Sequence, residues 1–212
     1  MSELAIRTLS GVAMIIVAIA AVVIGGYAFA ILAAAAATAV FYEWTRLTKG
    51  WGPAWYIGGF LYAAIAALAL LWIRERADNA DGLRLVLWVF IVVWSVDIGA
   101  YFTGRAIGGP KLAPSISPGK TWAGFYGGVA AAALLGGAWV LYSELNLVLL
   151  LLAPLFAAVA QGGDLFESWM KRRAGVKDSG GWLPGHGGVF DRVDGLLPVA
   201  ILTAIAAMAG AA

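Results

Sequence analysis

Long runs of apolar residues alternate with short polar stretches along the chain. A helix that crosses a membrane needs about 20 mainly apolar residues, because it rises about 1.5 Å per residue through a hydrocarbon core of about 30 Å. By this measure the sequence predicts seven spans, give or take one, at Leu4–Ile24, Tyr27–Tyr42, Ala54–Ile73, Leu83–Phe102, Trp122–Tyr142, Leu145–Ala160 and Gly195–Met208. We therefore expect an all-α integral membrane protein, a polytopic helical bundle with polar loops.

Three of these spans are less regular than the others. The second is short and follows a very tight turn at Gly25 and Gly26, so the first two spans can also be read as one broken or re-entrant element. The sixth and seventh are short as well, and both can continue as helix into the polar residues beside them. Glycines in the fifth span, at positions 124, 127, 128, 136 and 137, predict close helix packing through small side chains.

Composition supports the membrane assignment. Hydrophobic residues make up 62% of the chain and charged residues 12%, whereas ordinary soluble domains carry roughly 25% charged residues. The absence of cysteine excludes disulfides, thiolate metal sites and a cysteine nucleophile. The net charge of +2 is small, and we expect no nucleic-acid partner.

The positions of lysine and arginine predict the orientation. With seven spans, eleven of the 14 basic residues lie on one side of the membrane, and Arg74, Arg76 and Arg84 lie on the other. The positive-inside rule then puts the N-terminus and the even-numbered loops in the cytoplasm. We expect a multi-pass protein of the bacterial inner membrane, whose polar loops face the cytoplasm.

Two polar stretches break the apolar pattern, and both emerge on the predicted cytoplasmic face. The first runs from Asp97 to Thr121. Asp97 lies inside the fourth span, where a carboxylate is costly unless it meets a cation or a wet cavity. We therefore expect Asp97 either to belong to a functional site or to pair with a cation such as Arg105.

The loop that follows Asp97 combines basic residues with glycines and prolines. Fixed cations on a tightly turned backbone suit a polyanion, because side chains and exposed N–H groups can both approach phosphate oxygens. A loop that merely obeys the positive-inside rule is the alternative. The tripeptide Gly119, Lys120 and Thr121 is not a P-loop, because Pro114 stands where that motif needs glycine and an apolar span precedes it instead of a strand.

The second polar stretch runs from Asp164 to Gly195 and holds five acidic residues, five basic residues and the only histidine. Four of its side chains share one helix face where the sixth span leaves the membrane: Asp164, Glu167, Ser168 and Lys171. The basic run that begins at Lys171 can by itself anchor a helix to the membrane surface. Chemistry, if the chain performs any, is expected in this stretch.

Asp191 and Asp194 lie three residues apart, and we expect them on one face of the first turns of the last helix. Carboxylates at such close range repel one another, and a divalent cation relieves that repulsion. Hard carboxylate oxygens beside phosphates are what Mg²⁺ prefers. Asp164 and Asp191 are therefore our predicted metal pair, and the pattern is typical of phosphoryl or nucleotidyl transfer.

His186 stands between Gly185 and Gly187, in a stretch rich in glycine. The glycines remove side-chain bulk, so we expect a mobile loop whose backbone approaches a ligand. For His186 we expect a phosphate contact or a proton transfer, with a structural loop histidine as the alternative. A zinc site is poorly supported, because no second histidine and no cysteine exist to complete it.

These residues resemble the signature of the phosphatidate cytidylyltransferases, the CDP-diacylglycerol synthases. The likeness runs without a gap over 27 positions and rests on Ser168, Met170, Lys171, Arg172, Lys177, Asp178, Gly180, Leu183, Pro184, His186, Gly187, Gly188, Asp191, Arg192 and Asp194. The stretch that begins at Asp97 resembles the other cytoplasmic segment of that family, through Ala100, Tyr101, Gly104, Arg105, Leu112, Pro114, Ser117, Pro118, Lys120, Thr121 and Gly124. Together the two segments cover the C-terminal half, and the N-terminal half matches only as generic membrane helices.

The resemblance implies transfer of a cytidylyl group from CTP to phosphatidate, which gives CDP-diacylglycerol and pyrophosphate with Mg²⁺. It also implies a homodimer, contact with membrane lipids, and a polar cavity open to the cytoplasm; a second metal or a monovalent cation is left open. The residues expected to act in catalysis are Asp164, Asp191, Lys171, Arg172, Lys177 and His186, with Asp164 and Asp191 as metal ligands. Substrate contacts are expected from Asp97, Arg105, Ser117, Lys120, Thr121, Ser168, Asp178, Gly187, Gly188, Arg192 and Asp194.

We expect one polytopic domain over residues 1–212, with N-terminal helices over about 1–95 and the catalytic half over about 96–212. Two departures from the family pattern stand out: the chain is shorter than many members, as if one or two N-terminal spans were missing, and Gly119 stands where many relatives carry lysine. The alternative functions are a related CTP-dependent enzyme that acts on another lipid phosphate or alcohol and an ion-coupled carrier. A carrier would place its charges near the middle of the bilayer.

Overall fold

The fold was analysed in a computed structural model that describes residues 3–76, 79–183, 185 and 187–211. The helices are α1 (Glu3–Ile24), α2 (Gly26–Leu47), α3 (Pro53–Arg74), α4 (Asn79–Ile107), α5 (Trp122–Tyr142), α6 (Val148–Arg173), α7 (Phe190–Val193) and α8 (Leu196–Met208). Two short strands, β1 (Lys111–Ala113) and β2 (Ser117–Thr121), form an antiparallel hairpin between α4 and α5. The expectation of an all-α polytopic bundle is confirmed, with this hairpin as an addition.

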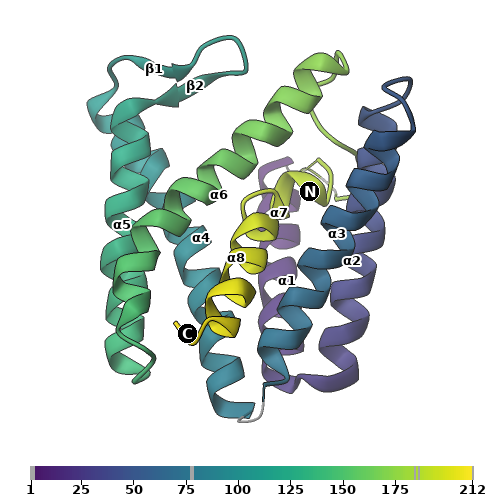
Figure 1. Cartoon of the computed structure of the whole chain (residues 1–212). Helices are drawn as coiled ribbons and strands as arrows, with labels where there is room; N and C mark the ends of the chain where they lie inside the picture. The colour runs from purple at the N-terminus through teal and green to yellow at the C-terminus, as the bar shows by residue number, and fades with distance from the viewer. Residues whose placement is uncertain (1–2, 77–78, 184, 186, 212) are drawn as a thin grey trace.

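Successive long helices run in opposite directions (Figure 1). The α2–α3 turn, the hairpin, the end of α6 and α7 lie at one end of the bundle, and the α1–α2, α3–α4 and α5–α6 turns lie at the other. We call the first the site end and the second the opposite end. The two polar stretches therefore meet at one end, as the predicted spans require.

The structure resolves the irregular spans. Helices α1 and α2 are separate and meet at Gly25, whose φ of 68° suits a residue without a side chain. Helix α6 continues through the polar residues to Arg173, and α2 extends five residues beyond the predicted end at Tyr42. Among the described residues, five helices are long and apolar enough to cross a membrane, and Thr8–Ile24 and Leu196–Met208 are shorter apolar helices.

Two local features differ from the predictions. Residues 111–121, expected as an irregular loop, pair across the hairpin as Lys111 with Thr121 and Ala113 with Ser117. Asp194 does not lie in the last helix but follows the four-residue helix α7. The backbone at Asp194 and Gly195 keeps helical angles (φ −53° and −77°), so α7 passes into α8 through a short irregularity.

Small residues bring α4 and α5 together, as predicted from the glycines of the fifth span. A Cβ atom on Gly99 would lie 2.6 Å from Cβ of Ala131, and one on Gly128 would lie 2.9 Å from the carbonyl oxygen of Val96. No larger side chain fits between the two backbones at these points. This close contact fixes the position of Asp97, which lies on α4 one residue beyond Val96.

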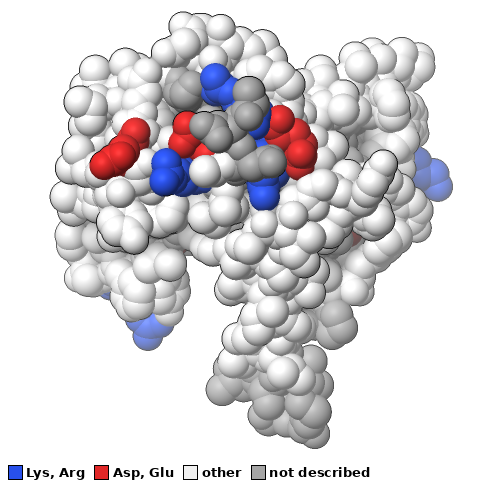
Figure 2. Space-filling model, turned by 90° about the horizontal axis from the view of Figure 1, so that it is seen from below, with Lys and Arg blue, Asp and Glu red and all other residues white. Residues whose placement is uncertain are grey.

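The opposite end carries few charges. Figure 2 shows this end, where acidic and basic side chains gather around the α3–α4 turn and a few further charged side chains lie apart from them on a mainly uncharged surface. Arg74 is only 5% exposed there, and it donates to the carbonyl oxygens of Val22 (2.7 Å) and Val23 (3.2 Å) at the end of α1. Arg74 therefore has a structural task that is separate from the polar stretches.

Candidate active site

The last turns of α6 carry the centre of the site. Ser168 Oγ donates to Asp164 Oδ1 over 3.2 Å, and Lys171 Nζ donates to Glu167 Oε2 over 2.6 Å. The members of each pair are four residues apart and lie along one helix face, as the spacing predicted. The Glu167 side chain is 1% exposed, and its Oε1 atom has no hydrogen-bond partner within the described part of the chain.

Asp191 fastens the loop of residues 174–189 to α6. Its Oδ1 atom accepts from Lys171 Nζ (2.5 Å), while Oδ2 accepts from the N–H of Ser179 (3.0 Å), the hydroxyl of Ser179 (3.0 Å) and the N–H of Gly188 (2.8 Å). Burial alone would raise the pKa of Asp191, but hydrogen bonds with Lys171, Glu167 and the N–H of Gly188, together with the positive charge of Lys171, lower it to about 2. Asp191 is therefore a fixed anion with both oxygens engaged.

The hairpin is attached to α6 at two points. Lys120 Nζ lies 2.7 Å from Asp164 Oδ2, and Arg172 Nε donates to the carbonyl oxygen of Ile116 over 3.1 Å. These contacts bring the two predicted polar segments together, although Asp164 and Lys120 are far apart in the sequence. Thr121, expected to contact substrate, is 6% exposed and instead caps α5, where its Oγ1 atom accepts from the N–H of Gly124 over 3.1 Å.

Three carboxylates act on one another beside Lys120: Asp97, Asp164 and Asp194. Burial, and then the negative charge of Asp164, raises the pKa of Asp194 to about 8. Asp97 is exposed, and the cations that act on it are Lys120 and Arg192. The charges of these side chains therefore act strongly on any ion, positive or negative, that binds at this point.

The alternative pairing of Asp97 with Arg105 is not what the structure has. The guanidinium of Arg105 donates to the hydroxyl of Tyr101 over 2.9 Å, and both side chains are exposed on α4. Arg105 therefore lies at the surface of the site end and not against the carboxylates.

Glu43, at the end of α2, is a residue that the sequence analysis missed. Its side chain is fully buried, and its oxygens accept from the hydroxyl of Ser179 (2.8 Å), the N–H of Val189 (3.0 Å) and the N–H of Phe190 (2.8 Å). The hydroxyl of Ser179 thus lies between Glu43 and Asp191. Through Glu43 the N-terminal half, read as generic membrane helices, holds the loop and the first turn of α7.

The glycines of the loop have a reason other than the expected contact with a ligand. A Cβ atom on Gly180 or Gly188 would overlap the carboxylate of Glu43, and one on Gly187 would lie 2.8 Å from Asp191 Oδ2. The backbone comes close to the protein's own acidic side chains, which explains why these positions lack side chains. His186 and Pro184 lie outside the described residues.

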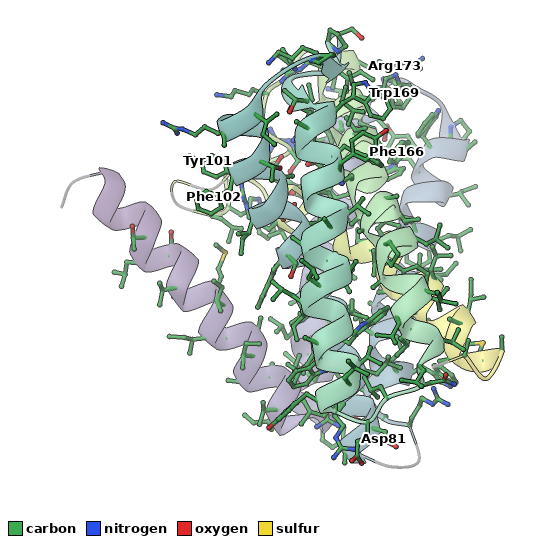
Figure 3. All side chains as sticks on the ribbon, turned by 90° about the vertical axis from the view of Figure 1, so that its left-hand side faces the viewer. Asp81, Tyr101, Phe102, Phe166, Trp169 and Arg173 are labelled. Carbon is green, nitrogen blue, oxygen red and sulfur yellow. The ribbon has the colours of Figure 1, made fainter. Side chains whose placement is uncertain are left out.

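The remaining expected residues lie around this centre. Lys177, Asp178 and Arg192 are exposed, and Ser117 is half-buried at the start of β2. The basic run at the end of α6 has divided tasks: Lys171 faces the carboxylates, Arg172 holds the hairpin, and Arg173 lies over the ring of Trp51 (4.5 Å) and near that of Trp169 (5.5 Å). Figure 3 shows Phe166, Trp169 and Arg173 in succession along α6. Surface anchoring therefore fits Arg173 alone among the three.

Within the described ranges, no group of three or more acidic or histidine side chains forms a ready-made metal cage. The donors nevertheless suit a hard cation, because Asp97 and Asp164 lie close enough to Asp194 for their negative charges to act on it. Of the predicted metal pair, Asp164 belongs to this group. Asp191 would have to release Lys171 or the loop before it could bind a cation.

Comparison with known proteins agrees with this geometry. The model of the cytidylyltransferase family matches residues 48–209. The chain is 38% identical over 252 residues to the phosphatidate cytidylyltransferases of Brucella suis and Brucella melitensis, with 95% of this chain and 92% of each relative covered. It is also 48% identical over 126 residues to the Haemophilus influenzae protein of the same name, which covers 56% of this chain and 44% of that one.

The 252 positions of the Brucella alignments exceed the 212 residues of this chain, so the relatives contain residues inside the aligned region that have no counterpart here. The difference in length is therefore not simply a missing N-terminal segment. The family model covers α3 to α8, including both polar stretches and every residue expected to act in the site. The chain belongs to the cytidylyltransferase family.

Proposed function

We propose that the protein transfers the cytidylyl group of CTP to phosphatidate, giving CDP-diacylglycerol and pyrophosphate. The observation that carries the proposal is the contact of Lys120 with Asp164, which joins the two polar segments into one charged site at the end of a membrane bundle. The relatives that cover almost the whole chain are phosphatidate cytidylyltransferases. A carrier is disfavoured, because most charged residues lie in the turns and the terminal parts of the helices and not midway along them.

The reaction requires two anions to meet. An oxygen of the phosphatidate phosphate forms a bond to the α-phosphorus of CTP, and the bond from that phosphorus to the oxygen bridging to the β-phosphate breaks, so pyrophosphate leaves. A phosphate monoester is already ionised at neutral pH, so the attack needs no strong general base. The work of the site is to position the two substrates and to offset their mutual repulsion.

The basic side chains of the site suit this task. Lys120, on strand β2 of the hairpin, reaches Asp164 on α6, and Lys177 and Arg192 are exposed around the same end and can meet phosphate oxygens. Lys171 is held by two carboxylates, Glu167 and Asp191, which keep it charged and fixed in direction. We assign Lys171 to the phosphate that bears the transferred group, because its position is the most strongly determined of the four cations.

We also propose that the reaction depends on Mg²⁺, with Asp164 as a ligand together with Asp194 and Asp97. When bound, the ion would offset phosphate charge and stabilise the departing pyrophosphate. Asp191, predicted as the second ligand, is assigned to the positioning of Lys171 and the loop, because both of its oxygens already accept hydrogen bonds.

The setting of the site supports two further proposals, on its orientation and on its membrane. The basic residues of the site end agree with a cytoplasmic orientation by the positive-inside rule, and the bacterial relatives agree with the inner membrane. The homodimer implied by the resemblance stays a prediction.

The test is a conversion assay on the purified protein in detergent, with phosphatidate and CTP labelled in the cytidine ring. We expect a lipid-soluble cytidine product when Mg²⁺ is present and none when it is chelated. Asp164→Asn should lower the rate by more than the roughly 10- to 100-fold typical for loss of a supporting residue at a metal site. Asp81→Asn, which removes an exposed carboxylate paired with Arg84 at the opposite end, is the matched control and should keep full activity.

Absence of product from the wild-type protein under these conditions would refute the function. Full activity of Asp164→Asn would refute the assignment of the site.

A further inference from the structure

We propose that an apolar groove between α3 and α6 holds one acyl chain of the lipid substrate, an inference that rests on the proposed function. The groove has a volume of about 740 Å³, within the range of roughly 300 to 1,000 Å³ of small-molecule sites. Helices α3 and α6 each pack on α8 but make few contacts with one another. The groove occupies the space between them, with Pro198 of α8 as part of its wall.

Missing side chains create the width of the groove. Ala54 and Gly58 are four residues apart on one face of α3, and Gly162 and Gly163 line the wall formed by α6. A Cβ atom built on Gly58 or on Gly162 meets nothing within 4 Å. Both glycines are exposed, so the groove is open at the surface of the bundle. The two helices that carry them, α3 and α6, are long and apolar enough to cross a membrane.

Aromatic rings form the remaining wall, so the surface of the groove is almost entirely apolar. Trp44, Trp55, Tyr62 and Phe166 line this part, and the indole N–H of Trp44 donates to the carbonyl oxygen of Trp55 over 2.8 Å. Among the described residues, charged side chains are absent from this wall, so it does not suit the phosphates of a nucleotide. It does suit hydrocarbon, whose burial is favourable by about 0.8 kcal/mol per methylene group.

The groove is continuous with the charged site. Gly163 lines the groove and is followed directly by Asp164, which binds Lys120. Gly163 also lies so close to the carbonyl oxygen of Asp194 that a Cβ atom there would overlap it. A lipid phosphate at Lys120, beside Asp164, would therefore have its glycerol at the mouth of the groove and a chain inside it.

Filling the groove tests the proposal. Gly58→Leu and Gly162→Leu put a side chain into the groove from opposite walls without a clash in the backbone. Ala138→Leu, at an exposed position on α5 away from the groove, is the matched control. The readouts are the KM for phosphatidate with octanoyl chains, the KM for phosphatidate with oleoyl chains, and the KM for CTP.

We expect the two glycine variants to raise the KM for the oleoyl substrate roughly tenfold, which corresponds to the displacement of about two methylene groups. The KM for the octanoyl substrate should rise less, and the KM for CTP should stay unchanged. An equal rise of KM for both chain lengths, or no rise of KM in active variants, would overturn the proposal that the groove holds an acyl chain. A wild-type protein that makes no product from either substrate would instead overturn the proposed function.

A binding measurement covers the case in which a leucine variant fails to fold. Phosphatidate with brominated chains should quench the tryptophan fluorescence of the wild-type protein more than phosphatidylcholine with the same chains does, because only the phosphatidate headgroup suits the charged site. Trp55→Phe should reduce this excess, since Trp55 lines the groove, while phenylalanine keeps an aromatic ring at this position and the backbone oxygen that accepts from Trp44. Equal quenching by the two lipids would overturn the proposal.

Discussion

Glu43→Gln is the substitution that tests most sharply whether the N-terminal half takes part in the site. The Oε1 atom of Glu43 accepts from the N–H of Val189, and Oε2 accepts from the N–H of Phe190 and the hydroxyl of Ser179. Glutamine keeps one of the two oxygens, so its NH₂ group faces a backbone N–H in either orientation. Hydrogen bonds to charged groups contribute about 1.5 to 3 kcal/mol each, and one of these is lost outright.

A loss of this size is large for the loop that Glu43 holds. Because 1.4 kcal/mol corresponds to a factor of ten in an equilibrium constant, the ordered arrangement of the loop should become about 10- to 100-fold less favoured. Ser179 links Glu43 to Asp191, so the perturbation should also reach Lys171. We therefore expect a fall in kcat/KM of about tenfold or more, together with a lower midpoint of thermal unfolding.

Unfolding in detergent and cytidylyl transfer are measured on the same preparation. Glu75→Gln is the matched control, because Glu75 also accepts a backbone N–H, that of Gly26 at 2.9 Å, but lies exposed at the opposite end. It should leave kcat/KM unchanged. The reasoning is wrong if Glu43→Gln retains both the unfolding midpoint and the kcat/KM of the wild-type protein.

Three further predictions follow from single contacts. Arg74→Met should lower the unfolding midpoint, because it removes the hydrogen bonds that hold the end of α1. The activity per folded molecule should stay unchanged, and a loss of activity in the folded variant would contradict the structural role of Arg74. Gly188→Ala should abolish activity, since a methyl group overlaps Ser179 and Glu43, whereas Gly181→Ala has open space and should be tolerated; equal activity of the two would contradict the packing. The pKa of Asp191 is lower in the folded protein than its ordinary value of 3.8, so its contribution to stability is present above about pH 4 and is lost as the pH falls towards 2. Acid titration monitored by tryptophan fluorescence should show a smaller loss of stability in Asp191→Asn than in the wild-type protein. Identical titrations of the two proteins would refute the assignment.

The fold was largely predictable because the membrane imposes a simple rule. Each span must be long and apolar, and a helix is the element that satisfies its own backbone within lipid. Among the described residues, the five long helices and the two shorter apolar ones therefore follow from the hydropathy pattern, and their alternating directions bring the two polar stretches to one end. The boundaries were less predictable where polar residues continue a helix. At the end of α6, for example, the apolar residues end several positions before the helix itself does.

The contacts within the site were predictable only where they are local. Asp164 with Ser168 and Glu167 with Lys171 follow from helical spacing. Glu43 did not stand out, because a single acid at the end of an apolar run looks like an ordinary helix end. Its partners lie 136 to 147 residues away, and no spacing rule connects them.

The glycines of the loop illustrate the same limit. Their number predicted that the backbone approaches another group closely, which is what the structure has at Gly180 and Gly188. The sequence favoured a ligand as that group, and the structure has the buried carboxylate of Glu43. The hairpin was hidden for a related reason, because proline and glycine at positions 110, 114, 118 and 119 are typical of irregular loops.

The fate of the CTP phosphorus atoms tests the central claim most directly. The wild-type protein is incubated with phosphatidate and CTP that carries label either at the α-phosphorus or at the γ-phosphorus, and the lipid fraction is counted. Transfer of a cytidylyl group predicts that the α-label enters the lipid and that the γ-label leaves in pyrophosphate. Label from the γ-phosphorus in the lipid would identify a CTP-dependent lipid kinase, and the absence of both labels from the lipid would contradict the proposed function.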